Sequence, residues 1–494
     1  MSTTNLHLFV MVVPLLSALA INLFGRSNRF LIAPLVLGSL TFSVFGSILV
    51  TGRVLRDGPI SYTVGNWQPP FGIELVVDPL SAMMMVLIAV VALLASFSSL
   101  QSVAKELPGR EAFFFTLYMI LIAGLFGLVL TGDAFNLYVL LEITSITTYG
   151  LVAMGPGRAA RASFNYIIMG SIGACFYLLG VGYIYILTGT LNMADIARIL
   201  PTLNAPGATA TSIAFVLIGL WIKMAFFPLH GWLPTAYGYA PTGAGTMVAP
   251  LMTKVTVYLM IRVILSVYTP ALVFANGWLA NGVLWAAAIA IVSGSSLALG
   301  QKDLRHMLTF IIVAEVGYMV GGVFLANANG LTGAVLHIVN DALMTLCLFL
   351  VVAAIVYRQG SVSLSSMQGI FRRMPWTMAA FVLGALAMIG VPPTCGFFSK
   401  WYLILGGIDG GHWEFVIALV ISSLINVVLF FRVIEIGYFG ALEDGGHHGP
   451  VQYQEAPGWM LNPLMLTAVL LVVVGLSTGP LVNNLIRLIV PAGF

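Results

Sequence analysis

Ionisable side chains stand inside stretches of this sequence that are otherwise apolar. Glu142 lies in VLLEITS, Lys223 in WIKMAFF and Lys254 in LMTKVTV. A charge at the centre of a lipid bilayer costs about 2.5–3.5 kcal/mol, so each of these groups needs a partner or water. Three more charged residues have similar surroundings, namely Glu315, Asp341 and Lys400.

Amines and carboxylates in such positions can carry protons. Desolvation favours the neutral form of a buried lysine, and a neighbouring carboxylate restores its charge. An amine that alternates between paired and unpaired states is therefore a proton site with a switchable affinity. His230 and His337 titrate near neutrality and fit as relays, although each alone fits a hydrogen-bonded core residue equally well. We interpret the set as a pathway for protons or cations, and the alternative is that buried ion pairs only join helices.

Other kinds of chemistry find little support in the sequence. It has no GxGxxG, P-loop or CxxC motif and no cluster of metal ligands, and its net charge of +3 does not suggest nucleic acid. The three cysteines lie apart in apolar runs, where we expect buried small side chains. Arg432 and Glu435 are spaced for a local ion pair on one helix. We therefore expect no catalytic chemistry, cofactor or metal in this chain.

Composition indicates a membrane protein. Of the 494 residues, 60% are hydrophobic and 7% are charged, whereas a soluble domain carries about a quarter charged residues. Apolar runs long enough to cross about 30 Å of hydrocarbon predict an all-α polytopic protein with about fourteen transmembrane helices. Lys and Arg gather in loops after odd-numbered helices, so we expect a cell inner (plasma) membrane protein with both termini on the outer side.

The spans fall into three predicted parts. An N-terminal three-helix segment covers 1–110, a core covers 111–440, and a C-terminal loop with the last helix covers 441–494. Within the core, two blocks of five helices have similar lengths and cover 112–268 and 278–438. Because five is odd, the second block enters the membrane inverted, and inverted repeats place a transport pathway at their interface.

Prolines interrupt the fourth helix of each block. Pro228 and Pro234 fall in span seven of the chain, and the Pro392-Pro393 pair falls in span twelve. Proline removes a backbone donor and clashes with the preceding turn, so each helix must break or kink there. The freed carbonyls need protein or water around them. We expect both breaks to lie beside the pathway.

Several motifs occur together and in order. They are DPLS at 78–81, GDAFN at 132–136 with Glu142 following, Lys223 with FPLHGWLP at 227–234, and TKV at 253–255. With these motifs the chain resembles the antiporter-like subunits shared by complex I, membrane-bound hydrogenases and Mrp-type cation/proton antiporters. It looks most like the D-type subunit of the Mrp antiporters, and the similarity runs from about residue 75 to 435.

The resemblance implies roles for the buried charges. Glu142 and Lys223 would form the central ion pair of the family, and Lys254 would relay protons along the membrane plane. His337 corresponds to the histidine of the eleventh helix. Lys400 matches the lysine that ends the relay in the second half.

The chain departs from the family pattern in three places. Asp341 stands where a second histidine is common, and Thr345 stands where a lysine is common. Asp341 could replace the histidine as a proton carrier, or the pathway could differ in the second block. Glu315 occupies a position that is usually neutral, so a carboxylate that attracts cations is a further candidate.

Three functions remain open from the sequence. The first is a proton-translocating subunit of a multi-subunit monovalent cation (Na⁺)/H⁺ antiporter, embedded in lipid among other membrane subunits. The second is a proton-pumping subunit of a NADH:quinone oxidoreductase or membrane-bound hydrogenase complex, and the third is a structural scaffold. The sequence chemistry favours ion transport over the scaffold, because lysines on separate helices are not explained by local pairing.

Overall fold

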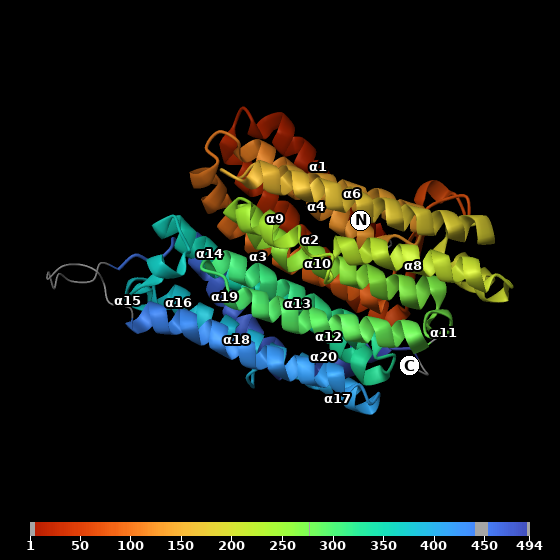
Figure 1. Cartoon of the computed structure of the whole chain (residues 1–494). Coiled ribbons are helices and arrows are strands. Elements are labelled where there is room, and N and C mark those ends of the chain that lie inside the picture. The colour runs from red at the N-terminus through yellow and green to blue at the C-terminus, as the bar shows by residue number, and fades with distance from the viewer. Residues whose placement is uncertain (1–4, 276, 440–452, 492–494) are drawn as a thin grey trace.

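The structure is a bundle of long membrane-crossing helices (Figure 1). It is a computed structural model that describes residues 5–275, 277–439 and 453–491. Thirteen of the described helices are long and apolar enough to cross a membrane, and a broken pair supplies one more crossing. The predicted C-terminal loop lies outside the described residues as far as residue 452.

The N-terminal part contains three spans and one β-hairpin. The strands pair antiparallel, with Ile60 opposite Val77 and Thr63 opposite Glu74. Asp78 then caps the third span in a capping box with Ser81, and proline follows at the first helical position, where no donor is needed. In chain order the elements are α1 (Leu6–Ala20), η2 (Ile21–Gly25), η3 (Arg29–Leu31), α2 (Ile32–Asp57), β1 (Ile60–Thr63), η4 (Val64–Asn66), β2 (Glu74–Val77) and α3 (Pro79–Glu106).

The first block crosses the membrane five times, and its fourth crossing is broken. A short helical excursion lies between the third and fourth crossings. The elements are α4 (Glu111–Leu130), α5 (Ala134–Ala153), α6 (Ala159–Thr188), α7 (Met193–Ile199), η5 (Leu200–Thr202), α8 (Pro206–Lys223), α9 (Leu233–Tyr239), α10 (Thr242–Val263), η6 (Ile264–Tyr268) and α11 (Pro270–Val273).

The second block repeats this plan, again with a broken fourth crossing, and one more span follows it. The predicted fold class, with breaks in spans seven and twelve, is confirmed. The elements are α12 (Gly277–Leu299), α13 (Leu304–Phe324), α14 (Ala328–Gln359), η7 (Leu364–Met367), α15 (Ile370–Arg373), α16 (Pro375–Ile389), α17 (Cys395–Asp409), α18 (Trp413–Phe439), α19 (Gly458–Leu476), α20 (Thr478–Asn484) and η8 (Ile486–Leu488).

The break in span seven comes earlier than its prolines suggest. Helix α8 ends at Lys223, and Ala225 has a left-handed φ of 58° that terminates the helix. The Trp232 indole donates to the Ile222 carbonyl (2.9 Å), which also accepts from the Ala225 backbone N–H (3.2 Å). Pro234 was expected to break a helix but instead lies in the first turn of α9, where its missing N–H costs nothing.

Burial separates central helices from peripheral ones. Helices α10, α13 and α14 are buried over almost their whole length, whereas α2, α6 and α18 leave one side exposed. In Figure 1, α6 and α18 lie at opposite edges of the bundle with α10 and α13 between them. Groups on the central helices are therefore shielded from lipid by protein, and half of the predicted site residues lie there, namely Lys254, Glu315, His337 and Asp341.

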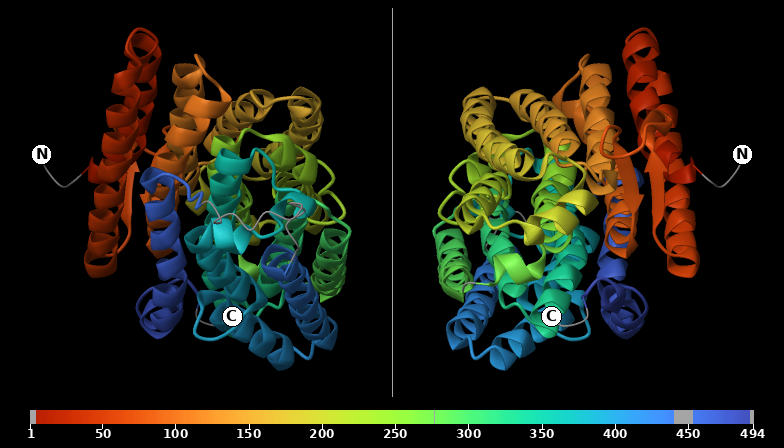
Figure 2. Two further views of the ribbon diagram at one scale, coloured as in Figure 1. Left: turned by 90° about the vertical axis from the view of Figure 1, so that its left-hand side faces the viewer. Right: turned by 90° about the vertical axis from the view of Figure 1, so that its right-hand side faces the viewer.

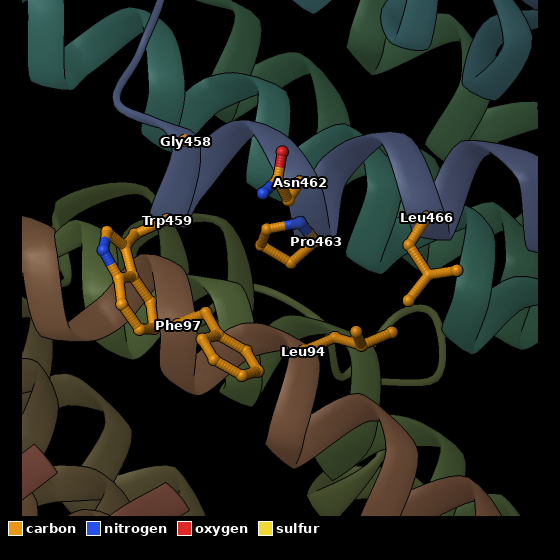
Figure 3. A pocket seen from close by; sticks show the side chains of 7 residues that line it. All are labelled: Leu94, Phe97, Gly458, Trp459, Asn462, Pro463 and Leu466. Carbon is orange, nitrogen blue, oxygen red and sulfur yellow. The ribbon is translucent and has the colours of Figure 1, made fainter.

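The last span joins the C-terminal part of the chain to the N-terminal part. Helix α19 packs against α3, and Phe97 stacks on Trp459 with ring centroids 5.8 Å apart. A groove of about 450 Å³ remains between the two helices, lined by Leu94, Asn462 and Leu466 among others (Figure 3). The N-terminal helices thus stay attached to the second block through α19.

A buried ion pair that the sequence did not reveal fixes α3 to α10. Arg262 donates to both carboxylate oxygens of Asp78 (2.5 and 2.7 Å) and to the Tyr258 hydroxyl. Burial alone raises the pKa of the Asp78 carboxyl, but the Arg262 charge and hydrogen bonds outweigh it and lower the pKa to about 2. The pair therefore stabilises the fold above about pH 4 and loses this effect only as the pH falls towards 2.

Asp78→Asn should lower the stability by about 3 kcal/mol, because asparagine keeps the helix cap but leaves Arg262 buried without a counter-charge. The measurement is the thermal denaturation midpoint of the purified protein at pH 7. Asp195→Asn, which removes an exposed pair with Arg198, should change the stability by less than about 1 kcal/mol. Equal shifts in the two variants would contradict this role of Asp78.

Candidate functional site: a buried row of ionisable side chains

The first cluster lies where α8 ends against α5. The Lys223 amine donates to Glu142 Oε1 (2.9 Å) and to the Ser145 hydroxyl (2.7 Å). Only 5% of the Lys223 side chain is exposed, against 26% of the Glu142 side chain. Lys223 is the last residue of α8, so its charge also lies at the negative end of the helix dipole. The pair that the resemblance implied is thus formed.

The second cluster joins the two blocks. Lys254 of α10 and Asp341 of α14 form an ion pair with 2.9 Å between Nζ and Oδ2, and both side chains are 0% exposed. The Lys254 amine lies 3.3 Å from the Thr345 hydroxyl, which itself donates to Asp341 Oδ1 (2.9 Å). Asp341 and Thr345, two of the three positions that were expected to depart from the family pattern, therefore act together as a partner for Lys254.

The third cluster lies within the second block. His337 Nε2 is 2.6 Å from Glu315 Oε2, and its Nδ1 is 2.8 Å from the Ser399 hydroxyl. Two lone pairs would repel one another at 2.6 Å, so a proton must lie between the imidazole and the carboxylate. All three side chains are fully buried. Glu315 and His337 are therefore joined by a buried hydrogen bond whose proton lies between the imidazole and the carboxylate.

Lys400 lies at the second helix break. Its amine donates to the Met388 carbonyl (2.6 Å), which the end of α16 leaves without a helical partner. The amine also lies over the Tyr318 ring, 5.0 Å from its centroid, and the same ring contacts the His337 imidazole at 5.4 Å. Tyr318 thus links Lys400 to the third cluster.

Gly390 makes room for Lys400. It ends α16 with a φ of 92°, which a residue with a side chain rarely adopts. A Cβ at this position would lie 3.2 Å from Lys400 Cδ. The residue that terminates the half-helix therefore also accommodates the lysine stem.

The two broken crossings share one design. In each block a lysine amine lies at the C-terminal end of a half-helix, where free carbonyls and the helix dipole favour a positive charge. Lys223 belongs to the half-helix itself, whereas Lys400 reaches the end of α16 from the following half-helix, α17. The breaks supply polar surroundings for an amine inside an apolar bundle.

One predicted site residue is not joined to the row by the contacts that the structure describes. The His230 ring stacks on Phe227, with centroids 5.1 Å apart, and contacts the Phe310 ring edge-on at 6.5 Å. Its relay role stays a prediction. The local pair expected for Arg432 and Glu435 is wrong, because the Arg432 guanidinium donates to the Leu299 carbonyl (3.1 Å) instead.

Three neutral residues of the row were missed in the sequence. Ser145 lies one helical turn after Glu142, so its spacing from that carboxylate was an available signal, whereas Ser399 directly precedes Lys400 and contacts His337 on another helix, which spacing along one helix does not indicate. Tyr318 follows Glu315 by three residues in the same way. Hydroxyl groups can accept one hydrogen bond while donating another, so they can bridge titratable side chains that do not touch.

The row is composed of amines, carboxylates and one imidazole, together with hydroxyl groups. Among residues 5–275, 277–439 and 453–491, no group of three or more His, Cys, Asp or Glu side chains is arranged to hold a metal ion. The row instead alternates amines, carboxylates and one imidazole on α5, α8, α10, α13, α14 and α17. Such an arrangement can store and exchange protons inside the bundle.

Comparison with known proteins shows what the chain is similar to. It is 40% identical to "NADH-quinone oxidoreductase subunit N" of Desulforudis audaxviator, over 99% of both chains. It is 29% identical to the D-type subunit of an Na(+)/H(+) antiporter from Alkalihalophilus pseudofirmus, over 97% of this chain and 95% of the relative. A chain in the structure of the Mrp complex from Dietzia sp. DQ12-45-1b superposes with a TM-score of 0.87 at 26% identity, covering 99% of this chain and 97% of that one.

A family model supports the same grouping. The model described as "NADH:quinone oxidoreductase/Mrp antiporter, TM" matches residues 131–426, which include all three clusters and both helix breaks. The relatives and the neighbouring structure are subunits of multi-subunit membrane complexes, as their names state. The chain belongs to the NADH:quinone oxidoreductase/Mrp antiporter transmembrane family and is an antiporter-like membrane subunit.

Proposed function

We propose that the chain translocates protons through the buried row, as one subunit of a larger membrane complex. The observation that carries the proposal is the fully buried Lys254–Asp341 pair, which joins α10 of the first block to α14 of the second, while each block also holds a pair of its own, Glu142–Lys223 and Glu315–His337. A scaffold would need only ion pairs. A scaffold would not need the hydrogen-bonded pair of Glu315 and His337 close to Lys400, whose amine contacts no carboxylate among the described residues.

The row is formally neutral at rest. Its three amines, on Lys223, Lys254 and Lys400, balance three carboxylates when the imidazole of His337 is uncharged. One added proton therefore raises the charge of this largely buried row by one unit, and that excess charge is unfavourable until it leaves. The balance favours passing single protons over storing several.

Proton transfer would proceed by making and breaking the pairs. A proton that neutralises Asp341 leaves the Lys254 ammonium without its counter-charge, which costs about 3–5 kcal/mol at a buried site. Lys254 then gives up a proton towards His337. The Glu142–Lys223 pair would open or re-form as the charge of Lys254 changes. Lys400, at the end of α16, first releases its own proton, and the neutral amine then receives the proton from His337.

The assembly that the chain serves is a second part of the proposal. We infer a monovalent cation (Na⁺)/H⁺ antiporter, as expected from the sequence, and the similarity to Na(+)/H(+) antiporter subunits supports this. The 40% identity to a NADH-quinone oxidoreductase subunit favours the alternative of a redox-driven proton pump. Both assemblies would use the same proton row.

Reconstitution separates these two assemblies. The purified complex is placed in vesicles containing a pH-sensitive dye, and Na⁺ gradients are imposed with and without NADH and quinone. Proton movement driven by Na⁺ alone supports the antiporter, and proton movement that requires electron transfer supports the pump. Vesicles that move protons under neither condition would contradict the proposed function.

The sidedness is also proposed. Because the basic residues gather in loops after odd-numbered helices, we place those loops, including Arg110 and Arg158, on the cytoplasmic side of the cell membrane. A cysteine introduced at Arg158 should react with a membrane-impermeant thiol reagent only in inverted vesicles. Labelling in intact cells would show that the protein has the opposite orientation in the membrane.

Glu315→Gln tests the third cluster. Glutamine can still hydrogen-bond His337 but cannot exchange a proton, so we expect transport to fall about a hundredfold while assembly is kept. The measurement is the initial rate of proton uptake in vesicles. Glu435→Gln, which changes an exposed carboxylate on α18, is the matched control and should leave the rate unchanged. If Glu315→Gln transports protons at the same rate as the control, Glu315 is not part of the pathway.

A further inference from the structure

A basic depression lies at the edge of the molecule, away from the proton row. It has a volume of about 890 Å³ and is lined by the α1–α2 connection and by the start of α4. Figure 2 shows the first two helices, in red, on the outer side of the bundle. None of the residues in this depression takes part in the pathway proposed above.

Three arginines from two segments of the chain line this depression. Arg26 follows α1 and η2, Arg29 begins η3, and Arg110 precedes α4. All three are exposed, and none forms an ion pair with a described residue. The one carboxylate in the lining is Glu111, so the depression carries a net positive charge. Unpaired arginines held together in this way favour an anion with several oxygen atoms.

Backbone groups strengthen the preference for an anion. Helix α4 has twenty residues, and its N-cap Arg110 makes no side-chain cap, so the first N–H groups of the helix lack a capping side chain. Residues 109–113 line the depression, which places this positive helix end beside the arginines. Both sources of positive potential therefore act on the same space.

The surroundings indicate a lipid rather than a dissolved anion. The continuous helix Leu6–Gly25 has the length of one bilayer crossing, so Arg26 lies at the level where headgroups begin. Phe30 is 78% exposed beside the arginines, and Leu19 and Leu23 lie 55% and 68% exposed along α1 and η2. A polar head bound among the arginines would leave its acyl chains along this apolar face.

We propose that this depression is a binding site for the phosphodiester headgroup of an anionic phospholipid. Arg26, Arg29 and Arg110 hold the phosphate oxygens, the α4 N-terminus adds backbone donors, and the exposed side of α1 takes the acyl chains. The lipid fastens the two peripheral helices to α4 at the membrane surface. The site is independent of the proton row and of the assembly in which the chain serves.

The test measures lipid binding to the delipidated complex by native mass spectrometry. Short-chain phosphatidylglycerol is titrated against short-chain phosphatidylcholine and inorganic phosphate. We expect phosphatidylglycerol to bind tightly, and we expect that neither phosphatidylcholine nor inorganic phosphate displaces it. The triple variant Arg26→Gln, Arg29→Gln, Arg110→Gln should bind it roughly a hundredfold more weakly, which corresponds to about 1 kcal/mol for each arginine. Arg110→Gln alone should weaken binding about fivefold.

The matched control removes three exposed arginines elsewhere, through Arg158→Gln, Arg161→Gln and Arg372→Gln. It should bind phosphatidylglycerol as tightly as the unchanged protein. Four outcomes would overturn the proposal: an unchanged affinity in the triple variant, an equal loss in the control, displacement by inorganic phosphate, or loss of a partner subunit with lipid binding kept. The last outcome would mean that an acidic protein segment occupies the depression.

Discussion

Lys223→Ala is expected to reduce proton transport to the background rate, a loss of at least a hundredfold, because a positioned proton-transfer group contributes about 10²–10⁴ in rate. Removal of the amine leaves Glu142 and Ser145 without the group that joins them. The measurement is the initial rate of dye response in vesicles containing the complex. Lys302→Ala, which changes an exposed lysine, should transport at the normal rate.

Lys223→Arg distinguishes a proton carrier from a structural partner. Arginine keeps its charge under all conditions, so it can pair with Glu142 but cannot release a proton. We expect normal assembly of the complex with transport as low as in Lys223→Ala. Full transport by Lys223→Arg would show that the charge, and not the proton, is what the site requires, and the proposed transfer step would be wrong.

Lys254→Met is expected to destabilise the protein by about 3–5 kcal/mol, because it leaves Asp341 charged and fully buried without a partner. Asp341→Leu alone should cost a similar amount for the opposite reason. The double variant Lys254→Met, Asp341→Leu should recover most of that loss, since two apolar side chains can replace a buried pair. Thermal denaturation of the purified complex measures the three values.

Transport in the double variant decides between two roles for this pair. If the pair only joins α10 to α14, the double variant should assemble and should also transport protons at the normal rate. If the pair belongs to the pathway, transport should stay at background despite restored stability. The exposed pair Arg198 and Asp195 is the matched control, and the same double substitution there should show coupling below about 1 kcal/mol.

Much of the architecture could be predicted because it depends on local patterns. Apolar length predicted the spans, and proline pairs predicted which two crossings are broken. The position of the break was less accurate, because helix α8 ends at Lys223 through the backbone conformation of Ala225, which no residue type in this stretch indicates. Alanine is a strong helix former, and here the tertiary fold overrides that preference.

The partners of the buried charges were harder to predict. Glu142 and Lys223 were paired through the family resemblance, whereas the partner of Lys254 was left open. Its ion pair with Asp341 depends on how α10 of one block packs against α14 of the other, and periodicity within each helix does not determine this. The contact of Lys400 with a backbone carbonyl could not be predicted from the sequence either. Every residue carries a carbonyl, and only the end of a helix leaves one without its helical hydrogen bond.

The position of the Lys254–Asp341 pair also constrains how the chain is made. Lys254 enters the membrane with α10, and its carboxylate is synthesised only after α12 and α13 have followed. During that interval the nascent chain holds an amine in hydrocarbon without its counter-charge. The first block therefore completes its own interior only when α14 arrives, and the two halves mature in the membrane as one unit.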